Sequence, residues 1–179
     1  MEGRSLRILS DWLKSEGIRE SIQLYDVDWK DGILGQREIE DILSNTREFI
    51  LQHDLVIQFF SRNAIAGPAQ VLSAVYHALR AGARGTSRTR DLSVDVLRFA
   101  AGERQIKVAV QKVGIQPGIK ECLCLVFIPD HQNRDQIVVR STVKSFLQEI
   151  GFGIVQGTEI KTADIADALE ATAMMELKL

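Results

Sequence analysis

The chain has 179 residues, of which 45% are hydrophobic and 26% are charged, and its formal net charge is −2. This composition excludes an intrinsically disordered chain and suits one globular domain over residues 1–179 with a sizeable core. The small net charge gives no global attraction for nucleic acid, so nucleic-acid binding would require a local basic surface.

The first third of the chain alternates helical and strand-like patterns. Residues 5–15 carry apolar side chains at helical spacing, and residues 22–29 form a strand-like run. Helical spacing returns over residues 35–52, and a compact β-rich run follows over residues 56–60. These patterns predict helix, strand, helix and strand in that order.

The middle of the chain is predicted to be helical. A helix opens at Pro68, because proline is tolerated in a first turn, and ends near Gly82 or Gly85. A polar arginine-rich loop over residues 84–90 precedes a helix over residues 92–101. Gly102 stops that helix, and a second helix starts at once, with residues 103–105 in its first turn and Ile106, Ala109, Val110 and Val113 buried.

The last third completes the fold class. Residues 122–128 are apolar on both faces, which predicts a strand in the interior of a sheet. A helix over residues 138–150, a strand over residues 152–156 and a final helix over residues 162–177 follow. We therefore predict an α/β (α+β) fold with a small, mainly antiparallel central sheet of about four strands covered by several helices.

The sequence offers no recognisable catalytic or metal-binding motif. None of its three histidines stands at metal-ligand spacing with Cys, Asp or Glu, and there is no HExxH, GxSxG or Walker motif. The acidic pairs are typical of solvated or capping residues. We expect no cofactor, no metal and no enzymatic activity. An enzyme whose active site follows none of these motifs remains an alternative.

The two cysteines and the hydropathy pattern indicate a cellular compartment. Cys122 and Cys124 stand two residues apart on a predicted strand, where they cannot form a bridge of normal geometry and suit a core. The sequence shows no apolar run of membrane length and no signal-peptide pattern. We therefore expect a protein of the reducing cytoplasm that makes no membrane contact.

Positive charge gathers around the joint at Gly102. Residues 80–112 contain eight Lys or Arg residues against three acidic ones. At the joint, Glu103, Arg104 and Gln105 are predicted to stand beside unpaired backbone N–H groups and the positive end of a helix dipole, which favours a phosphate or carboxylate. Three alternatives stay open: solvated helix faces with a turn-forming glycine, an anion site, and a helix-turn-helix DNA reader.

Two segments resemble a known family. AGERQI at residues 101–106, between LSVDVLRFA and AVQKVGI, and FSRNAIAG at residues 60–67, which leads into a helix with AVYHALRA, resemble the small kinase-binding subunit of the KEOPS complex, the PRPK-binding or TPRKB-like proteins. The resemblance covers residue 21 to the C-terminus and leaves residues 1–20 as an N-terminal extension. Gln70 departs from it, because histidine is expected there.

The resemblance implies a function without catalysis. The family's subunit binds an atypical protein kinase/ATPase within KEOPS, which makes threonylcarbamoyladenosine in tRNA, and it recruits tRNA through the single-stranded 3′ CCA end. Stacking and phosphate contacts should hold such an end. The tRNA-binding residues are therefore predicted to be Arg62, Asn63, Arg84, Arg88, Gly102, Arg104 and Gln105. The rival from a different class is a small helix-turn-helix-like DNA-binding regulator.

The kinase contact is predicted on the C-terminal helix. An apolar stripe with two methionines suits an adaptable interface, although it suits packing on the sheet nearly as well. The stripe consists of Leu169, Ala173, Met174 and Met175.

Overall fold

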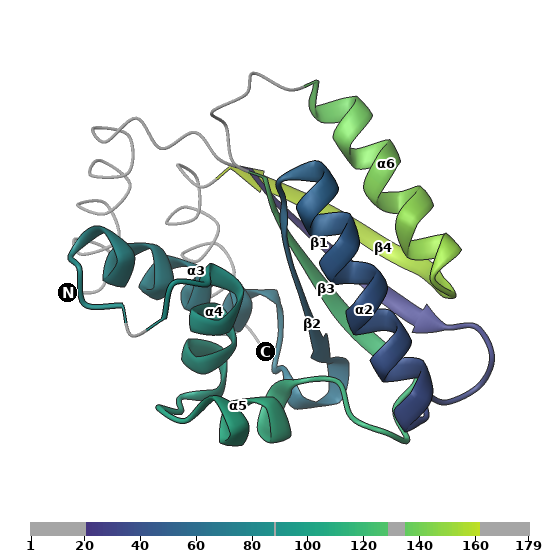
Figure 1. Ribbon diagram of the computed structural model, residues 1–179, viewed down its shortest axis with the longest axis horizontal. Coiled ribbons are helices and arrows are strands. Elements are labelled where there is room, and N and C mark those ends of the chain that lie inside the picture. The colour runs from purple at the N-terminus through teal and green to yellow at the C-terminus, as the bar shows by residue number, and fades with distance from the viewer. Residues whose placement is uncertain (1–20, 88, 129–134, 162–179) are drawn as a thin grey trace, which may run out of the picture.

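A four-stranded antiparallel sheet forms the centre of the molecule. The computed structural model describes residues 21–87, 89–128 and 135–161, so the helices expected over residues 5–15 and 162–177 lie outside the described residues. The strand order is β2-β3-β1-β4, and every neighbouring pair is antiparallel (Figure 1). The strands are β1 (Ser21–Trp29), β2 (Val56–Ser61), β3 (Glu121–Ile128) and β4 (Phe152–Lys161). The predicted α+β class and the mainly antiparallel sheet of about four strands are confirmed.

Helices cover both faces of this sheet (Figure 1). The odd-numbered side chains of β1 pack with α2 and α6, and the even-numbered side chains Ile22 and Leu24 pack with α3, α4 and α5. This arrangement divides the core into two clusters, one on each face. The helices are α2 (Gln36–His53), α3 (Pro68–Ala83), α4 (Leu92–Ala101), α5 (Ile106–Val113) and α6 (Gln136–Glu149), and the short 3₁₀ helix η1 spans Arg62–Ala64.

The interior strand β3 explains why its sequence is apolar on both faces. Cys122 and Cys124 belong to the core cluster beside α2 and α6, whereas Leu123 and Leu125 belong to the cluster beside α3, α4 and α5. Both cysteines are free and buried, and burial raises the pKa of the Cys122 thiol to about 12. They therefore act as small apolar side chains of the core, as predicted.

The last strand is longer than predicted. We expected a strand over residues 152–156, but β4 continues to Lys161, which pairs with Ser21 at the start of β1. The extra residues begin with Gly157 and Thr158, which lack the apolar alternation of a half-buried strand. Hydrogen-bonded pairing with β1 therefore holds these residues in a strand, although their side chains do not predict one.

Candidate nucleic-acid surface at the α4–α5 joint

The joint between α4 and α5 is a turn built around Gly102. Gly102 adopts φ 65°, a left-handed conformation that glycine takes without steric cost, and it ends α4 as predicted. The N–H of Glu103 donates to the carbonyl of Arg98 at 3.0 Å, which folds the chain back over the last turn of α4. The backbone after Gly102 is therefore held against the end of α4.

The start of α5 corrects the prediction for this joint. The prediction that residues 103–105 form the first turn of the second helix is wrong, because α5 begins at Ile106 and Gln105 is its N-cap. The predicted burial is also wrong in part: Ala109 and Val113 are buried, but Ile106 and Val110 are 47% and 39% exposed. The positive end of the α5 dipole thus lies two residues beyond Arg104.

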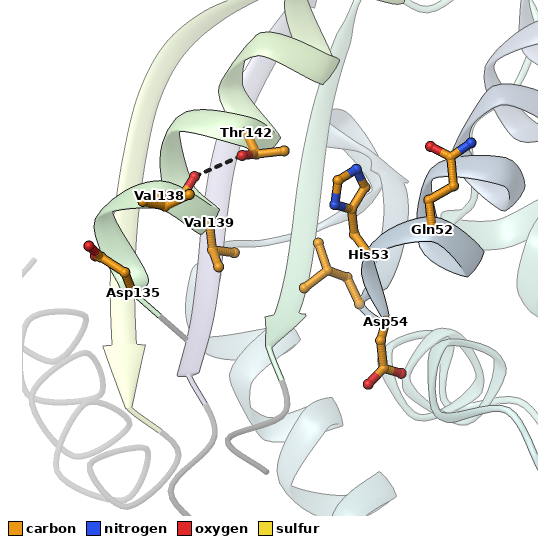
Figure 2. Close-up of a pocket in the computed structure, with 8 residues that line it drawn as sticks. Gln52, His53, Asp54, Asp135, Val138, Val139 and Thr142 are labelled. Carbon is orange, nitrogen blue, oxygen red and sulfur yellow. Dashed lines mark hydrogen bonds between the residues drawn. The ribbon is translucent and has the colours of Figure 1, made fainter. Parts of the chain in front are cut away.

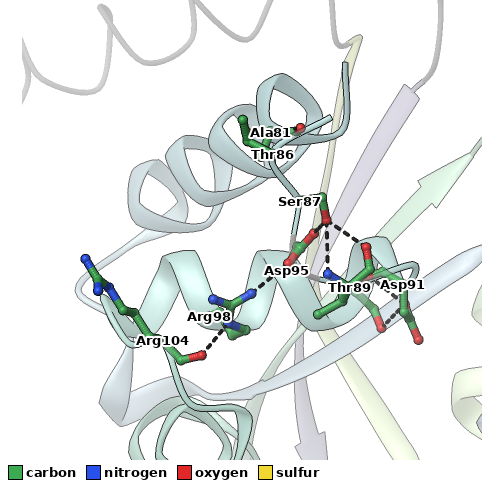
Figure 3. A network of polar contacts seen from close by, with 9 residues as sticks. Ala81, Thr86, Ser87, Thr89, Asp91, Asp95, Arg98 and Arg104 are labelled. Carbon is green, nitrogen blue, oxygen red and sulfur yellow. Dashed lines mark hydrogen bonds and ion pairs between the residues drawn. The ribbon is translucent and has the colours of Figure 1, made fainter. Parts of the chain in front are cut away.

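A buried ion pair fixes this turn from beneath. Asp95 on α4 is 4% exposed and accepts hydrogen bonds from the Arg98 guanidinium at 3.1 Å and from the Ser87 hydroxyl. The Arg98 Nε–H donates in turn to the backbone carbonyl of Arg104 at 2.9 Å (Figure 3). The chain from Asp95 through Arg98 to Arg104 therefore holds the backbone of the turn in one position, which is how a binding group becomes preorganised.

The Arg104 side chain extends away from this network (Figure 3). It is exposed, and its guanidinium forms no ion pair with another described residue. Glu103, by contrast, accepts from the Lys112 ammonium at 3.1 Å, which neutralises the carboxylate nearest to Arg104 in the sequence. Arg104 is therefore an exposed cation that no carboxylate among the described residues neutralises.

An aromatic cluster and a hollow lie beside Arg104. Phe99 is 43% exposed and stacks on His77 of α3 with a centroid distance of 5.7 Å, and His77 contacts Tyr76 at 4.8 Å. His77 is exposed at the surface, but partial burial of its ring, reinforced by the charge of Arg80, lowers the pKa of the imidazole. The hollow has a volume of about 360 Å³ and is lined by Ala81, Thr86, Ser87, Asp95, Arg98, Phe99, Gly102, Glu103 and Arg104.

The predicted tRNA-binding residues that the structure describes lie at the α4–α5 joint, just after α3 and in η1. Gly102, Arg104 and Gln105 meet at the α4–α5 joint, and exposed Arg84 follows the end of α3. Arg62 and exposed Asn63 belong to η1 at the end of β2. Arg88 lies outside the described residues, as do the predicted kinase-binding residues Leu169, Ala173, Met174 and Met175.

Arg62 differs from Arg104 in already having partners. Its Nε–H donates to the Asp26 carboxylate on β1 at 2.8 Å, and its Nη1 donates to the carbonyl of Ile65 at 3.1 Å. These contacts tie η1 to the sheet. Arg62 therefore has a structural role that its position in the family-like segment of residues 60–67 did not indicate.

Gln70 and Phe99 were not among the predicted site residues. The Gln70 side chain accepts from the N–H of Ala66 at 2.8 Å and donates to the carbonyl of Ala100 at 2.7 Å, so it joins the loop before α3 to the end of α4. Only its departure from the family pattern drew attention to it in the sequence. Helical spacing places Phe99 on one apolar stripe of residues 92–101, but it does not show which stripe meets solvent.

A second cleft lies between the end of α2 and the start of α6 (Figure 2). The Asp135 carboxylate accepts from the N–H of Ile137 at 2.8 Å and so caps α6, and the Thr142 hydroxyl donates to the Val138 carbonyl of its own helix at 2.9 Å. Two of the polar side chains that line this cleft are therefore engaged within α6 and its cap. It has a volume of about 470 Å³ and is lined by Gln52, His53, Asp54, Leu55, Asp135, Val138, Val139 and Thr142.

Metal binding and membrane insertion find no support in the described part of the chain. Within residues 21–87, 89–128 and 135–161, no three His, Cys, Asp or Glu side chains gather closely enough to hold a metal ion. Over the same ranges, every helix is too short or too polar to cross a bilayer.

The fold and this surface define an α+β protein in which Arg104 and Phe99 line one hollow at a turn held by hydrogen bonds. A family model described as kinase binding protein CGI-121 matches residues 36–175, and the chain belongs to this family. Both segments that carried the resemblance, residues 60–67 and 101–106, lie inside the match, so the suspected family is confirmed. Residues 21–35, which include β1, precede the match. A comparison with curated proteins found no match.

Proposed function

We propose that the chain is a non-catalytic, cytoplasmic subunit of the KEOPS complex, which makes threonylcarbamoyladenosine in tRNA. It binds the atypical kinase/ATPase of that complex and recruits tRNA through the single-stranded 3′ CCA end. Membership of a kinase-binding family supports the first partner. The family resemblance of residues 60–67 and 101–106 suggests the tRNA partner.

The observation that carries tRNA binding is the juxtaposition of Arg104 with exposed Phe99 at one hollow. A single-stranded end offers phosphates to a cation and unstacked bases to an aromatic ring. Arg104 supplies the cation, Phe99 supplies the ring, and the contact from Arg98 to the Arg104 carbonyl holds the turn between them. Recognition of a flexible end by preorganised groups loses less entropy on binding than recognition by a mobile loop.

The experiment compares tRNA with the same tRNA lacking its last three nucleotides, both titrated onto the full chain at fixed salt. We expect the truncated tRNA to bind more weakly than the intact tRNA. Phe99→Ala should lower the affinity for intact tRNA by about tenfold, since base stacking contributes about 1–3 kcal/mol per base. Leu51→Ala is the matched control, because Leu51 is an 80% exposed apolar residue on α2. Equal affinities for the two tRNAs would contradict the proposal.

The DNA-binding rival has weaker support. In a helix-turn-helix reading α5 would be the recognition helix, but it has eight residues and exposes Ile106, Val108 and Val110. A helix in the major groove needs polar side chains that reach base edges. A duplex DNA titration run beside the tRNA titration separates the two, and tighter binding to duplex DNA than to tRNA would favour the rival.

The kinase contact is proposed on the C-terminal stripe that contains Met174 and Met175, from the sequence pattern alone. Met174→Glu should abolish capture of the purified kinase while leaving the melting temperature unchanged. Lys178→Glu, a charge change near the same end of the chain, is the control. If the stripe packs in the core instead, Met174→Glu buries an unpaired charge and lowers the free energy of unfolding by about 3 kcal/mol or more.

A further inference from the structure

A small polar pocket lies on the other face of the sheet, beneath α6. It has a volume of about 130 Å³, several times the roughly 30 Å³ that one water molecule occupies in the liquid. The pocket can therefore hold a group of several heavy atoms. Its lining comes from three elements: Gln23 and Tyr25 of β1, Arg140 and Lys144 of α6, and Gly157 and Thr158 of β4.

The floor of the pocket depends on the pairing of Tyr25 with Gly157. These residues are cross-strand partners on β1 and β4, and a Cβ atom added to Gly157 would lie 2.9 Å from the Tyr25 ring. Glycine therefore allows the ring to lie directly against the backbone of β4. A larger residue at this position would push the ring away and alter the pocket.

The buried Gln23 amide lacks a partner for its donor end. Gln23 is 1% exposed, and the Tyr25 hydroxyl donates to its Oε1 at 2.7 Å. Burial raises the pKa of Tyr25 to about 12, so this hydroxyl keeps its proton at neutral pH. The Gln23 Nε2, by contrast, has no hydrogen-bond acceptor among the residues that the structure describes. A buried N–H donor without an acceptor is costly, so this group favours a bound acceptor.

Among the described residues that line the pocket, both charged side chains are positive. Arg140 and Lys144 stand four residues apart on α6, a spacing that places both side chains on one side of a helix. Lys144 forms no ion pair with another described residue, and no Asp or Glu is among the described residues that line the pocket. The pocket thus combines a buried amide donor with two cations, which is a donor set for a negatively charged acceptor.

We propose that this pocket binds a small oxyanion of the inorganic phosphate class through Gln23 Nε2, Lys144 and Arg140. The site is independent of the tRNA surface, because β1 presents Gln23 and Tyr25 to the face that packs against α6 and not to the face that carries α4 and α5. A phosphate offers an oxygen to each of the three donors at once. A carboxylate such as acetate offers two oxygens and should bind more weakly.

The first experiment titrates inorganic phosphate, and separately acetate, into the full chain at constant ionic strength set with chloride. We expect a saturable NMR shift of the Gln23 side-chain NH₂ group with phosphate. Lys144→Gln should weaken phosphate binding by about tenfold, because one charge-assisted hydrogen bond to the anion is lost. Lys120→Gln removes an exposed charge outside the pocket and should change nothing.

The second experiment uses Gln23→Glu, which keeps an oxygen for the Tyr25 hydroxyl and replaces the NH₂ donor by an acceptor. This variant should fold, by circular dichroism, and lose phosphate binding. If it fails to fold, Lys144→Gln alone decides, because Lys144 is exposed. The proposal is overturned if phosphate moves the Gln23 signal no more than chloride does, or if Lys144→Gln binds phosphate as tightly as the parent. Acetate binding in addition to phosphate would support the oxyanion class.

Discussion

Two joints of the molecule carry an arginine within a segment that resembles the family, and they use it in opposite ways. At η1, Arg62 is engaged by the Asp26 carboxylate and the Ile65 carbonyl, and its side chain is 32% exposed. At the α4–α5 joint, the ion pair is formed by Arg98 and Asp95, and Arg104 extends into solvent above it. The difference teaches that an arginine is open to a ligand only where another residue forms the ion pair that holds the joint. Arg98 does so for Arg104, whereas Arg62 forms that ion pair itself.

The strongest test of this comparison removes the structural support at the α4–α5 joint. Asp95→Ala leaves the Arg98 guanidinium, which is 11% exposed, without its carboxylate. We expect the free energy of unfolding, measured by urea denaturation, to fall by about 3 kcal/mol, as when one partner of a buried pair is removed. Asp91→Ala removes the exposed cap of the same helix and should cost about 1 kcal/mol. Equal costs for the two variants would mean that the buried pair does not support the joint.

The next test removes the extended arginine. Arg104→Ala should weaken tRNA binding by about tenfold at low salt, and it should flatten the dependence of log affinity on log salt by about 0.7–0.9, because one fewer counterion is released. The free energy of unfolding should stay within about 0.5 kcal/mol of the parent value. Arg47→Ala on the opposite face is the control. If Arg104 serves packing alone, stability falls and tRNA affinity is unchanged.

The third test removes the engaged arginine. Arg62→Ala should lower the free energy of unfolding by about 1 kcal/mol, because it loses a half-exposed ion pair and a hydrogen bond to a carbonyl. Its effect on tRNA affinity should be smaller than that of Arg104→Ala. A double-mutant cycle with Asp26→Ala measures the coupling that the 2.8 Å contact predicts. An Arg62→Ala protein of unchanged stability that binds tRNA more weakly than Arg104→Ala would break the comparison.

The smallest expected effect concerns His77 beside Phe99. Its pKa is lowered from the ordinary value of 6.5 by burial and by Arg80, so the unfolded chain binds this proton at a higher pH than the folded chain. Stability from His77 is therefore present above pH 6.5 and is lost as the pH falls through the folded-state pKa. Between pH 7 and pH 5, the parent should lose more stability than His77→Gln in matched thermal melts. Parallel losses would show that the imidazole is not held neutral.

The sequence was sufficient to predict the elements of the fold wherever hydrophobic periodicity was strong. The apolar run over residues 122–128 became the interior strand β3, and the stop at Gly102 became the left-handed end of α4. Prediction was weaker where backbone pairing acts without an apolar pattern, as in the second half of β4. A local pattern carries no information about a strand that pairs from a distance.

The candidate site could be predicted in position but not in detail. The residues AGERQI identified the joint, yet they did not show that Arg98 binds the Arg104 carbonyl or that Gln70 spans from Ala66 to Ala100. These contacts join residues from different elements, so they depend on tertiary packing. The same reason explains Arg62 of η1, whose partner Asp26 lies on β1.

The strand order has a consequence for how the chain folds during synthesis. β1 is made before the other described strands, yet its two neighbours, β3 and β4, are made last among them. At about 5–20 residues per second, the roughly ninety residues between β1 and β3 leave β1 without a sheet partner for about 5–20 seconds. The apolar side chains of β1 are exposed during that interval, so the nascent chain should depend on chaperones more than a protein of the same size built from local hairpins.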